Sequence, residues 1–287
     1  MLDAEVKPST LYVVATPIGN LRDITLRALD VLAKVNRIVA EDTRNTSILL
    51  KHHGITAKLL SLHQHNERGR AQELVEQLAS GASVALVSDA GTPGISDPGA
   101  IVVNEVRQAG YAVVPIPGAS ALTAALSASG MHALPFCFHG FLPAKSSARR
   151  AYLESLKQQA GALIFYEAPH RVIESTSDLA AVLGTERDLV IARELTKLFE
   201  TIHRCALGEA SQWLAADPNR LKGEFVLIVA GAPPVAAVND VELARVLTLL
   251  LAQELSVKQA AKLGAAIVGV GKNLAYERAL ALRDSTD

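Results

Sequence analysis

The sequence predicts an α/β protein with two α/β domains, a cleft between them, and a small C-terminal helical unit that resembles a helix-turn-helix. Three observations lead to this prediction. Over residues 10–130, short aliphatic runs alternate with amphipathic stretches, which is typical of a parallel, doubly wound sheet. Over residues 131–232 strands and helices alternate again in a different composition, which indicates a second domain with mixed strand pairing. A proline-containing linker at 231–235 then leads into residues 239–287, where only helical spacing remains.

The first domain is expected to contain five strands that end in polar residues. The strands are predicted at residues 11–15, 37–40, 58–62, 84–87 and 112–116, and the helices at 26–32, 48–53, 71–79, 100–106 and 121–129. Because parallel strands end at the same edge of a sheet, we expect their polar ends to converge there, where open α/β sheets bind ligands.

The elements of the second domain and of the C-terminal unit are predicted in the same way. Strands are predicted at 136–141, 162–166, 188–192 and 225–230, with helices at 147–159, 171–183 and 208–216. In the C-terminal unit, helices are expected at 240–251, from Ser256 onward, and at 274–282. Gln259 completes a capping box with Ser256, and Gly269 and Gly271 form the turn that follows.

Composition limits the function classes. The chain has 287 residues and a formal net charge of −1, whereas a general nucleic-acid binder usually carries a basic excess. An RNA partner would therefore be bound by a local patch or inside a larger particle. Only 4% of the residues are aromatic, which argues against many base-stacking platforms.

The cysteine content and the hydropathy of the chain indicate the cellular compartment in which we expect the protein. Cys137 and Cys205 are too few for a disulfide framework or a cysteine-based zinc site, which suits a reducing cytoplasm. Residues 1–10 lack the apolar segment of a signal peptide. No apolar run reaches the roughly 18 to 20 residues of a membrane helix. We expect a cytoplasmic protein with no membrane association and no metal centre.

The stretch from Ser83 to Gly99 is the strongest local signal. A buried strand at 84–87 runs into a loop rich in glycine and proline, and a helix follows. Glycine lets the backbone approach a ligand closely, and proline fixes the path of the loop. Asp89 follows the strand directly, where its carboxylate can accept hydrogen bonds from a ligand. A binding loop is favoured here over a surface turn.

Two other strand ends carry candidate residues. Residues 16–20 form a turn that lacks the glycine-rich phosphate motifs, so a ligand with little phosphate fits better. Glu41, Asp42 and Arg44 follow the second strand; they form either a polar clamp on a substrate or an ion pair with helix caps. His63 and His65 follow the third strand and suit hydrogen bonding to a substrate, with exposed loop histidines as the alternative.

Charged residues in the second domain leave similar alternatives. Glu167, His170 and Arg171 lie between a strand and a helix, where they can contact a substrate or cap the helix. Arg193 and Lys197 indicate either a phosphate site or an ion-paired surface.

A small basic cluster is the best candidate for contacts with an RNA backbone. It consists of Lys145, Arg149 and Arg150. The C-terminal unit has balanced charges, so a packing or dimerisation module remains an alternative to RNA binding.

Five motifs together resemble the tetrapyrrole methylase superfamily, and in it the branch that methylates ribosomal RNA. They are VATPIGNL at 14–21, AEDTR at 40–44, SDAGTPG at 88–94, PGAS at 117–120 and YEAPHR at 166–171. The resemblance spans about residues 10 to 232, and the C-terminal helices resemble that branch's terminal extension. Ile18 and Asn20 stand where tetrapyrrole methylases carry more glycine, which favours the RNA branch.

The resemblance implies a homodimer that binds S-adenosyl-L-methionine in the cleft. It also implies methyl transfer to the ribose 2′-oxygen of a cytidine in the decoding region of 16S rRNA, on the assembled 30S subunit. By position in the superfamily, the cofactor site would include Pro17, Asp89, Gly91, Ile95, Ala119, Ser120, Tyr166 and the backbone of Glu224, Phe225 and Val226.

A ribose hydroxyl is a poor nucleophile, so the site must help to remove its proton. The candidates for this role are Asp42, Glu41 and Glu167, and Arg44, Arg171, Arg193 and Lys197 are expected to hold phosphates. Two other functions stay open on the sequence: a methyltransferase for a tetrapyrrole, and a ribosome-binding assembly factor without catalysis. The intact strand-end loop argues against the second.

Overall fold

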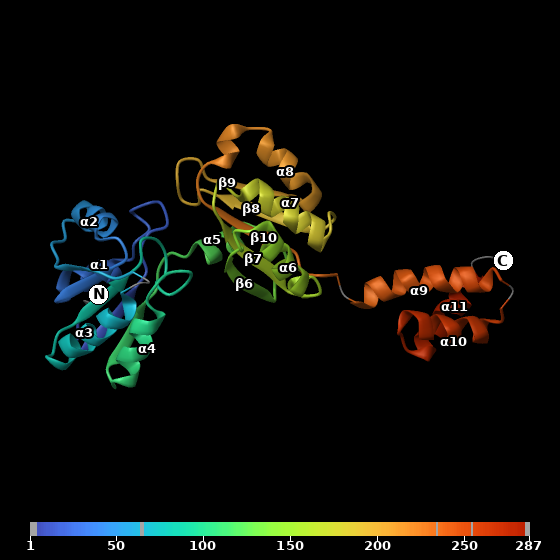
Figure 1. Cartoon of the computed structure of the whole chain (residues 1–287), viewed down its shortest axis with the longest axis horizontal. Helices are drawn as coiled ribbons and strands as arrows, with labels where there is room; N and C mark the ends of the chain where they lie inside the picture. The colour runs from blue at the N-terminus through green and yellow to red at the C-terminus, as the bar shows by residue number, and fades with distance from the viewer. Residues whose placement is uncertain (1–4, 64–65, 234, 254, 285–287) are drawn as a thin grey trace. The chain divides into compact units, whose positions relative to one another are not determined.

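The structure is a computed structural model that describes residues 5–63, 66–233, 235–253 and 255–284 (Figure 1). The chain divides into two units. The first contains residues 1–157 and 162–230, and the second contains residues 158–161 and 231–287. Both predicted α/β sheets lie in the first unit, so the predicted boundary at residue 130 stays a prediction.

The N-terminal sheet is entirely parallel, as expected, with the strand order β3-β2-β4-β1-β5. Its strands are β1 (Thr10–Val14), β2 (Arg37–Ala40), β3 (Leu59–Ser61), β4 (Val84–Val87) and β5 (Ala112–Ile116). Its helices are α1 (Leu26–Lys34), α2 (Thr43–His52), α3 (Glu67–Ala79), α4 (Ala100–Gln108) and α5 (Ala121–Ala128). The central strand β4 is buried along its whole length, which explains its uninterrupted aliphatic sequence.

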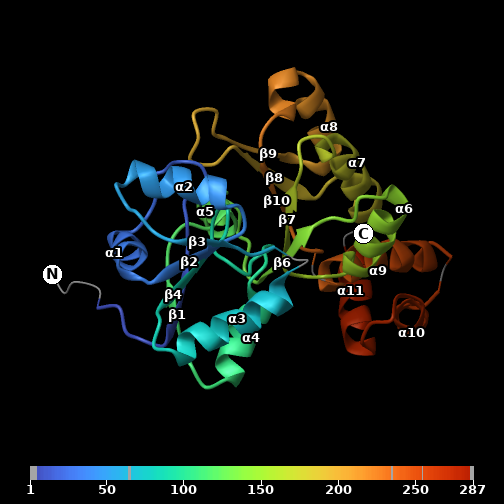
Figure 2. The same cartoon turned by 60° about the vertical axis from the view of Figure 1, so that its left-hand side comes forward.

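Alternating side chains of this sheet build two cores. Ile38 and Ala85 point to one face and pack with Leu32 of α1 and Leu50 of α2. Val39 and Leu86 point to the opposite face, which α3 and α4 cover side by side (Figure 2). The topology therefore leaves the carboxyl ends of the strands uncovered by these helices.

The second sheet has mixed pairing, with the strand order β6-β7-β10-β8-β9. Its strands are β6 (Phe136–Phe141), β7 (Ala162–Glu167), β8 (Asp188–Arg193), β9 (Thr201–Ala206) and β10 (Phe225–Val229). The pair β6–β7 is parallel and the other three pairs are antiparallel. Helices α6 (Ser146–Leu156), α7 (Val172–Leu183) and α8 (Leu207–Ala215) cover one face, and η1 (Pro218–Leu221) follows α8.

One strand of this sheet was absent from the sequence prediction. β9 is an edge strand whose side chains are exposed or half-buried, so its sequence lacks the aliphatic run that marked the other strands. It pairs with β8 along its full length, and the turn between the two strands carries Lys197.

The second unit is a three-helix bundle of α9 (Val235–Leu251), α10 (Val257–Val268) and α11 (Lys272–Asp284), in which each helix contacts the other two. Ser256 and Gln259 form the predicted capping box at the start of α10, and Gly269 ends this helix in the left-handed conformation. A Cβ atom on Gly264 would lie 2.8 Å from Leu247, so glycine permits the close approach of α9 and α10.

Candidate active site

A cavity of about 360 Å³ lies at the carboxyl ends of β4 and β5 and is walled by the second sheet. This volume is within the range of about 300 to 1,000 Å³ that is usual for small-molecule sites. The lining combines aliphatic walls with a few polar groups. It consists of Ile18, Ala90, Gly91, Thr92, Ile95, Ser96, Asp97, Ser120, Ala121, Phe141, Tyr166, Glu167, Ala168, Pro169, Leu195, Glu224, Phe225 and Val226.

The loop from Gly91 to Gly99 forms one wall of the cavity and is fixed at both ends. At its start, Gly91 has a φ of 82° and exchanges two backbone hydrogen bonds with Thr16, at 2.8 and 3.0 Å. At its end, the buried carboxylate of Glu67 accepts hydrogen bonds from Gly99 N at 2.8 Å and Ile101 N at 2.9 Å. The loop is therefore held by Thr16, which follows β1, and by Glu67 at the start of α3, and both are distant from the loop in the sequence.

Tyr166 connects the second sheet to the cavity. Its phenol oxygen accepts a hydrogen bond from Leu122 N at 3.2 Å, in the first turn of α5. The rings of Phe138 and Phe141 contact its ring edge-on. Burial raises the pKa of Tyr166, so this side chain stays neutral at physiological pH.

A second hollow of about 400 Å³ adjoins the cavity, and we call it the adjoining groove. The two share Ile18, Ala90 and Glu224. The rest of the adjoining groove is lined by Thr16, Pro17, Gly19, Leu21, Asn45, Thr46, Ile48, Leu49, Ser88, Asp89 and Lys197.

The expected cofactor residues fall into three groups. Seven of them line the cavity: Gly91, Ile95, Ser120, Tyr166, Glu224, Phe225 and Val226. Pro17 and Asp89 line the adjoining groove instead. Ala119 lines neither; its carbonyl accepts a hydrogen bond from the Thr92 hydroxyl at 3.2 Å and so holds the loop that forms the wall.

Asp89 and Asp42 organise the ends of β4 and β2. The Asp89 carboxylate accepts hydrogen bonds from Asp42 N at 2.8 Å and from Asn45 Nδ2 at 3.1 Å. Asp42 caps α2 through Arg44 N and pairs with the Arg44 guanidinium at 2.6 Å. The hydrogen bonds from Arg44 lower the pKa of Asp42 to about 2, so this predicted proton acceptor is a weak base.

Two other carboxyl groups at the same edge have raised pKa values, in contrast to Asp42. Burial raises the pKa of Asp97 to about 6; the charge of Asp89 adds to this rise, and a hydrogen bond with Ser88 opposes it. Burial, together with the charges of Asp97, Asp89 and Asp42, also raises the pKa of Glu41. Glu41 lines neither the cavity nor the adjoining groove.

Glu167 lines the cavity, but its side chain is buried and its hydrogen bonds stabilise the fold. It is 2% exposed. Oε1 accepts hydrogen bonds from Ala168 N and the Arg171 guanidinium, and Oε2 accepts one from the Ser175 hydroxyl at 2.5 Å. These contacts occupy both oxygens, so the structure argues against the predicted proton transfer to Glu167. They also tie Arg171 to the start of α7 rather than leaving it for a phosphate.

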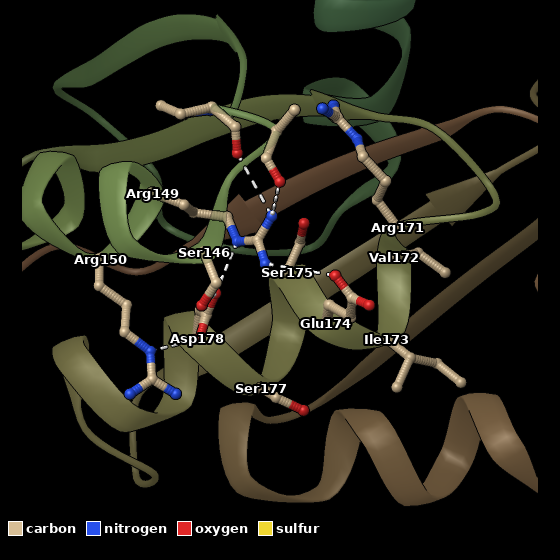
Figure 3. Close-up of polar contacts among 12 residues, drawn as sticks. Ser146, Arg149, Arg150, Arg171, Val172, Ile173, Glu174, Ser175, Ser177 and Asp178 are labelled. Carbon is tan, nitrogen blue, oxygen red and sulfur yellow. Dashed lines mark hydrogen bonds and ion pairs between the residues drawn. The ribbon is translucent and has the colours of Figure 1, made fainter.

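The basic cluster is divided by the fold, and Arg149 requires a correction. Figure 3 shows its guanidinium between α6 and α7, where Nε donates to Asp178 at 2.7 Å and Nη1 donates to the carbonyls of Pro143 and Ala144. Arg149 is 0% exposed. It therefore fixes the segment after β6 and cannot reach an RNA backbone. Arg150 is exposed beside it and pairs with the other oxygen of Asp178.

Arg193 requires the same correction, because it is 7% exposed. Its guanidinium donates to the carbonyl oxygens of Lys222, Phe199 and Asn219, at 2.7 to 3.0 Å. These bonds hold the turn between β8 and β9 to the segment before β10. The side chain is thereby withdrawn from the predicted contact with a phosphate.

The remaining predicted substrate residues lie at the surface or at the adjoining groove. Lys197 lines the groove and bridges Glu194 and Glu224 at 2.9 and 2.8 Å. Arg44, His63, Lys145 and His170 are exposed. His65 lies outside the described residues.

Several lining residues were not among the predicted site residues, and Asp97 is the most informative. It belongs to a second Ser-Asp-x-Gly sequence in the same loop, eight positions after Asp89. That repeat was a usable signal, but its placement in the cavity depends on the turn from Gly94 to Ser96, where both residues have positive φ. Leu195 and Pro169 also line the cavity, and neither was among the predicted site residues.

Neither a metal site nor a membrane-spanning helix is found in the part of the chain that the structure describes. No group of three His, Cys, Asp or Glu side chains is placed there to hold a metal ion. None of the helices in that part has the length and apolarity needed to span a bilayer.

Comparison with known proteins defines the class first. Residues 10–211 match the family of Tetrapyrrole (Corrin/Porphyrin) Methylases. A uroporphyrin-III-C-methyltransferase from Thermus thermophilus shares the fold, with a TM-score of 0.57, 18% identity and coverage of 77% of this chain and 94% of that one. Cobalt precorrin-4 methyltransferase does so with a TM-score of 0.58, 15% identity and coverage of 77% and 95%. The chain belongs to the tetrapyrrole methylase family, as the sequence motifs indicated.

Comparison with individual proteins points to one branch of this family. Ribosomal RNA small subunit methyltransferase I of Haemophilus influenzae is 50% identical, over 94% of this chain and 96% of the relative. The protein of the same name from Escherichia coli O157:H7 is 51% identical over 96% of each, and that of Vibrio cholerae is 53% identical over 93% of each. Residues 237–283 match the RsmI C-terminal HTH domain, so the similarity includes the helical unit.

Proposed function

We propose that this chain transfers the methyl group of S-adenosyl-L-methionine to the ribose 2′-oxygen of a cytidine in 16S rRNA. The observation that carries the proposal is the identity of about half of all residues to ribosomal RNA small subunit methyltransferase I, over nearly the whole length of both proteins. The two solved tetrapyrrole-modifying enzymes cover 77% of this chain, whereas the rRNA enzymes cover 93 to 96% of it and residues 237–283 match the RsmI C-terminal HTH domain.

The cavity fits a compact organic cofactor of this kind. Aliphatic side chains of Ile18, Ile95 and Val226 form its walls, and Gly91 has no side chain to block the approach of a ligand to the backbone. Ser120 and Tyr166 supply hydroxyl groups to the lining. We assign cofactor binding to these residues, to the backbone of residues 224–226 and to Asp89, which is next to the shared residue Ala90. When bound, the cofactor supplies an activated methyl group, so no metal is required by the chemistry.

The adjoining groove suits the target nucleotide. It shares Ile18, Ala90 and Glu224 with the cavity, so a nucleotide whose base lies in the groove can place its ribose at the junction with the cavity, which Asp97 lines. Pro17, Leu21 and Ile48 offer apolar contact to a base, and Asn45 and Lys197 offer hydrogen-bond donors. A single nucleotide must leave its base stack to enter such a groove, as it does for enzymes that modify bases.

Contacts with the rest of the RNA are assigned to exposed basic side chains. Arg44, Lys145, Arg150 and His170 are exposed in the first unit, and Lys258, Lys262 and Lys272 in the second. This set is small for a chain with a net charge of −1. It suits recognition of the assembled 30S subunit, where the decoding region is presented in a fixed shape. We place the protein in the cytoplasm with the ribosome and expect a homodimer.

The proposal is tested by methyl transfer from radiolabelled S-adenosyl-L-methionine to three acceptors: 30S particles, free 16S rRNA and a uroporphyrinoid. We expect label in the 16S rRNA of 30S particles only, at a single cytidine whose 2′-O-methyl group blocks alkaline cleavage of the backbone. Label in the uroporphyrinoid would favour a small-molecule methyltransferase. Binding to 30S particles without label in any acceptor would favour an assembly factor without catalysis.

A further inference from the structure

Three carboxylates line the cavity within the described residues, and only one of them is available. Glu167 is buried and bound by Arg171 and Ser175. Glu224 pairs with Lys197 at 2.8 Å, and its side chain is 74% exposed. Asp97 is half-buried, and no salt bridge joins it to a cation in the part of the chain that the structure describes. The neutral Ser88 hydroxyl lowers the pKa of Asp97, but this hydroxyl also lies within hydrogen-bond distance of the carbonyl oxygens of Ala90 and Gly91.

The loop backbone on both sides of Asp97 has a fixed conformation. Pro98 and Gly99 follow it and are buried, and Gly99 N donates to the Glu67 carboxylate at 2.8 Å. Ser96 precedes it with a φ of 67°, a conformation that turns the chain sharply towards the cavity. A group that must meet a reacting atom needs this kind of fixed position.

The charges around Asp97 favour its action as a base near neutral pH. The titratable groups that interact with it are Asp89 after β4, Glu41 after β2 and Tyr166 on β7, and none of them is a cation. A carboxyl in such surroundings holds a proton more firmly than an exposed one, which makes it a better proton acceptor. Asp42 lacks this property because Arg44 neutralises it.

We infer that Asp97 accepts the proton of the ribose 2′-hydroxyl during methyl transfer. This inference rests on the proposed function. The 2′-oxygen forms a bond to the methyl carbon, the carbon–sulfur bond breaks with its electron pair remaining on sulfur, and the hydroxyl proton moves to an Asp97 carboxylate oxygen. The positive charge of the sulfonium and the negative charge of Asp97 are both lost in the step. The carboxyl then releases its proton to water.

The first test compares Asp97→Asn with Glu105→Gln, which removes an exposed carboxylate from the helix that follows the same loop. General-base catalysis is worth about 10²- to 10⁴-fold, so we expect Asp97→Asn to lose that factor in kcat on 30S particles. Its affinity for S-adenosyl-L-methionine, measured by calorimetry, should stay within about fivefold of the unmodified protein. Glu105→Gln should match the unmodified protein in both.

The second test uses the unmodified chain and avoids the question of folding. kcat/KM should fall about tenfold for each pH unit below about 6, because protonated Asp97 cannot accept a further proton. In ¹³C-carboxyl NMR spectra, one aspartate resonance should titrate near pH 6, and it should be missing from Asp97→Asn. Asp97→Glu, which keeps the carboxylate on a longer side chain, should recover part of the lost turnover.

Three outcomes would overturn the inference: full turnover by Asp97→Asn, a loss of cofactor affinity as large as its loss of turnover, or a pH profile that is flat down to pH 5. The second outcome would make Asp97 a cofactor ligand. Failure of the proposed function is distinguishable, since in that case the unmodified protein itself would transfer no methyl group to 30S particles.

Discussion

Two carboxylates that reach the same cavity from different sheets have opposite environments. Glu167 ends β7 of the second sheet, is 2% exposed and is bound by Arg171, Ser175 and a backbone N–H. Asp97 lies on the loop after β4 of the N-terminal sheet and has acidic neighbours in place of a cation. Position at the end of a strand is therefore not enough to make a carboxylate reactive.

The same contrast runs through both sheets. In the second sheet Arg149, Glu167 and Arg193 are buried and bound by fixed partners, as in the Arg149–Asp178 contact between α6 and α7 (Figure 3). In the N-terminal sheet the acidic residues crowd the strand ends, where burial and mutual repulsion raise the pKa values of Glu41 and Asp97. These buried groups of the second sheet stabilise its fold, whereas Asp97 in the N-terminal sheet keeps a carboxylate without a cationic partner. Substitutions should separate these roles.

The largest effect on stability is expected for Arg149→Ala. It would leave the 4%-exposed carboxylate of Asp178 without its buried partner and remove the bonds to Pro143 and Ala144. Breaking a buried ion pair costs about 3 to 5 kcal/mol. Urea unfolding should show this loss, whereas Arg150→Ala, which removes a half-exposed partner of the same carboxylate, should cost about 1 kcal/mol or less. Equal losses would contradict the structural role of Arg149.

Glu167→Ala should come next, with a loss of about 2 to 4 kcal/mol in the free energy of unfolding. The substitution leaves Arg171, whose side chain is 17% exposed, and the Ala168 N–H without their acceptor. The matched change in the N-terminal sheet is Glu41→Ala, which removes a carboxylate whose ionisation its surroundings disfavour, and we expect it to cost less than about 1 kcal/mol. A larger loss of stability for Glu41→Ala than for Glu167→Ala would contradict the difference between the two sheets.

Asp89→Ala should weaken cofactor binding more than it weakens the fold. Asp89 holds the start of α2 through Asp42 N and Asn45, beside the shared wall of the two hollows. We expect about a tenfold rise in the dissociation constant for S-adenosyl-L-methionine by calorimetry, which corresponds to about 1.4 kcal/mol. Asp23→Ala, at an exposed position before α1, serves as the control. Unchanged affinity would remove Asp89 from the cofactor site.

The smallest effect is a pH-dependent gain in stability from Asp97→Asn. The pKa of Asp97 is about 6 in the folded chain and about 3.9 when unfolded, so the folded state binds this proton more tightly. Its contribution to stability is therefore present below about pH 4 and is lost as the pH rises to about 6. Because the side chain is half-exposed, we expect the variant to gain only about 1 kcal/mol at pH 7.5 and nothing at pH 4. Thermal unfolding at the two pH values measures the difference.

The sequence by itself determined the parts of this protein that depend on neighbouring residues. The aliphatic run at 84–87 followed by glycine and proline predicted both a buried strand and a binding loop, and the structure has both a fully buried β4 and a cavity wall there. The capping box of Ser256 and Gln259 was equally local and is present. The five motifs indicated the tetrapyrrole methylase family, and the family match confirmed it.

Only the tertiary structure decided which charges are available. Arg149 and Arg150 are adjacent in a helix, yet one is buried and the other is exposed, because successive helical residues point in directions about 100° apart and only one faces α7. Whether Glu167 or Asp97 is available for chemistry depends on partners from other segments: Ser175 on α7 binds the first, and the charge of Asp89 raises the pKa of the second. Burial and charge pairing are set by contacts between distant parts of the chain, and no local pattern of residues records them.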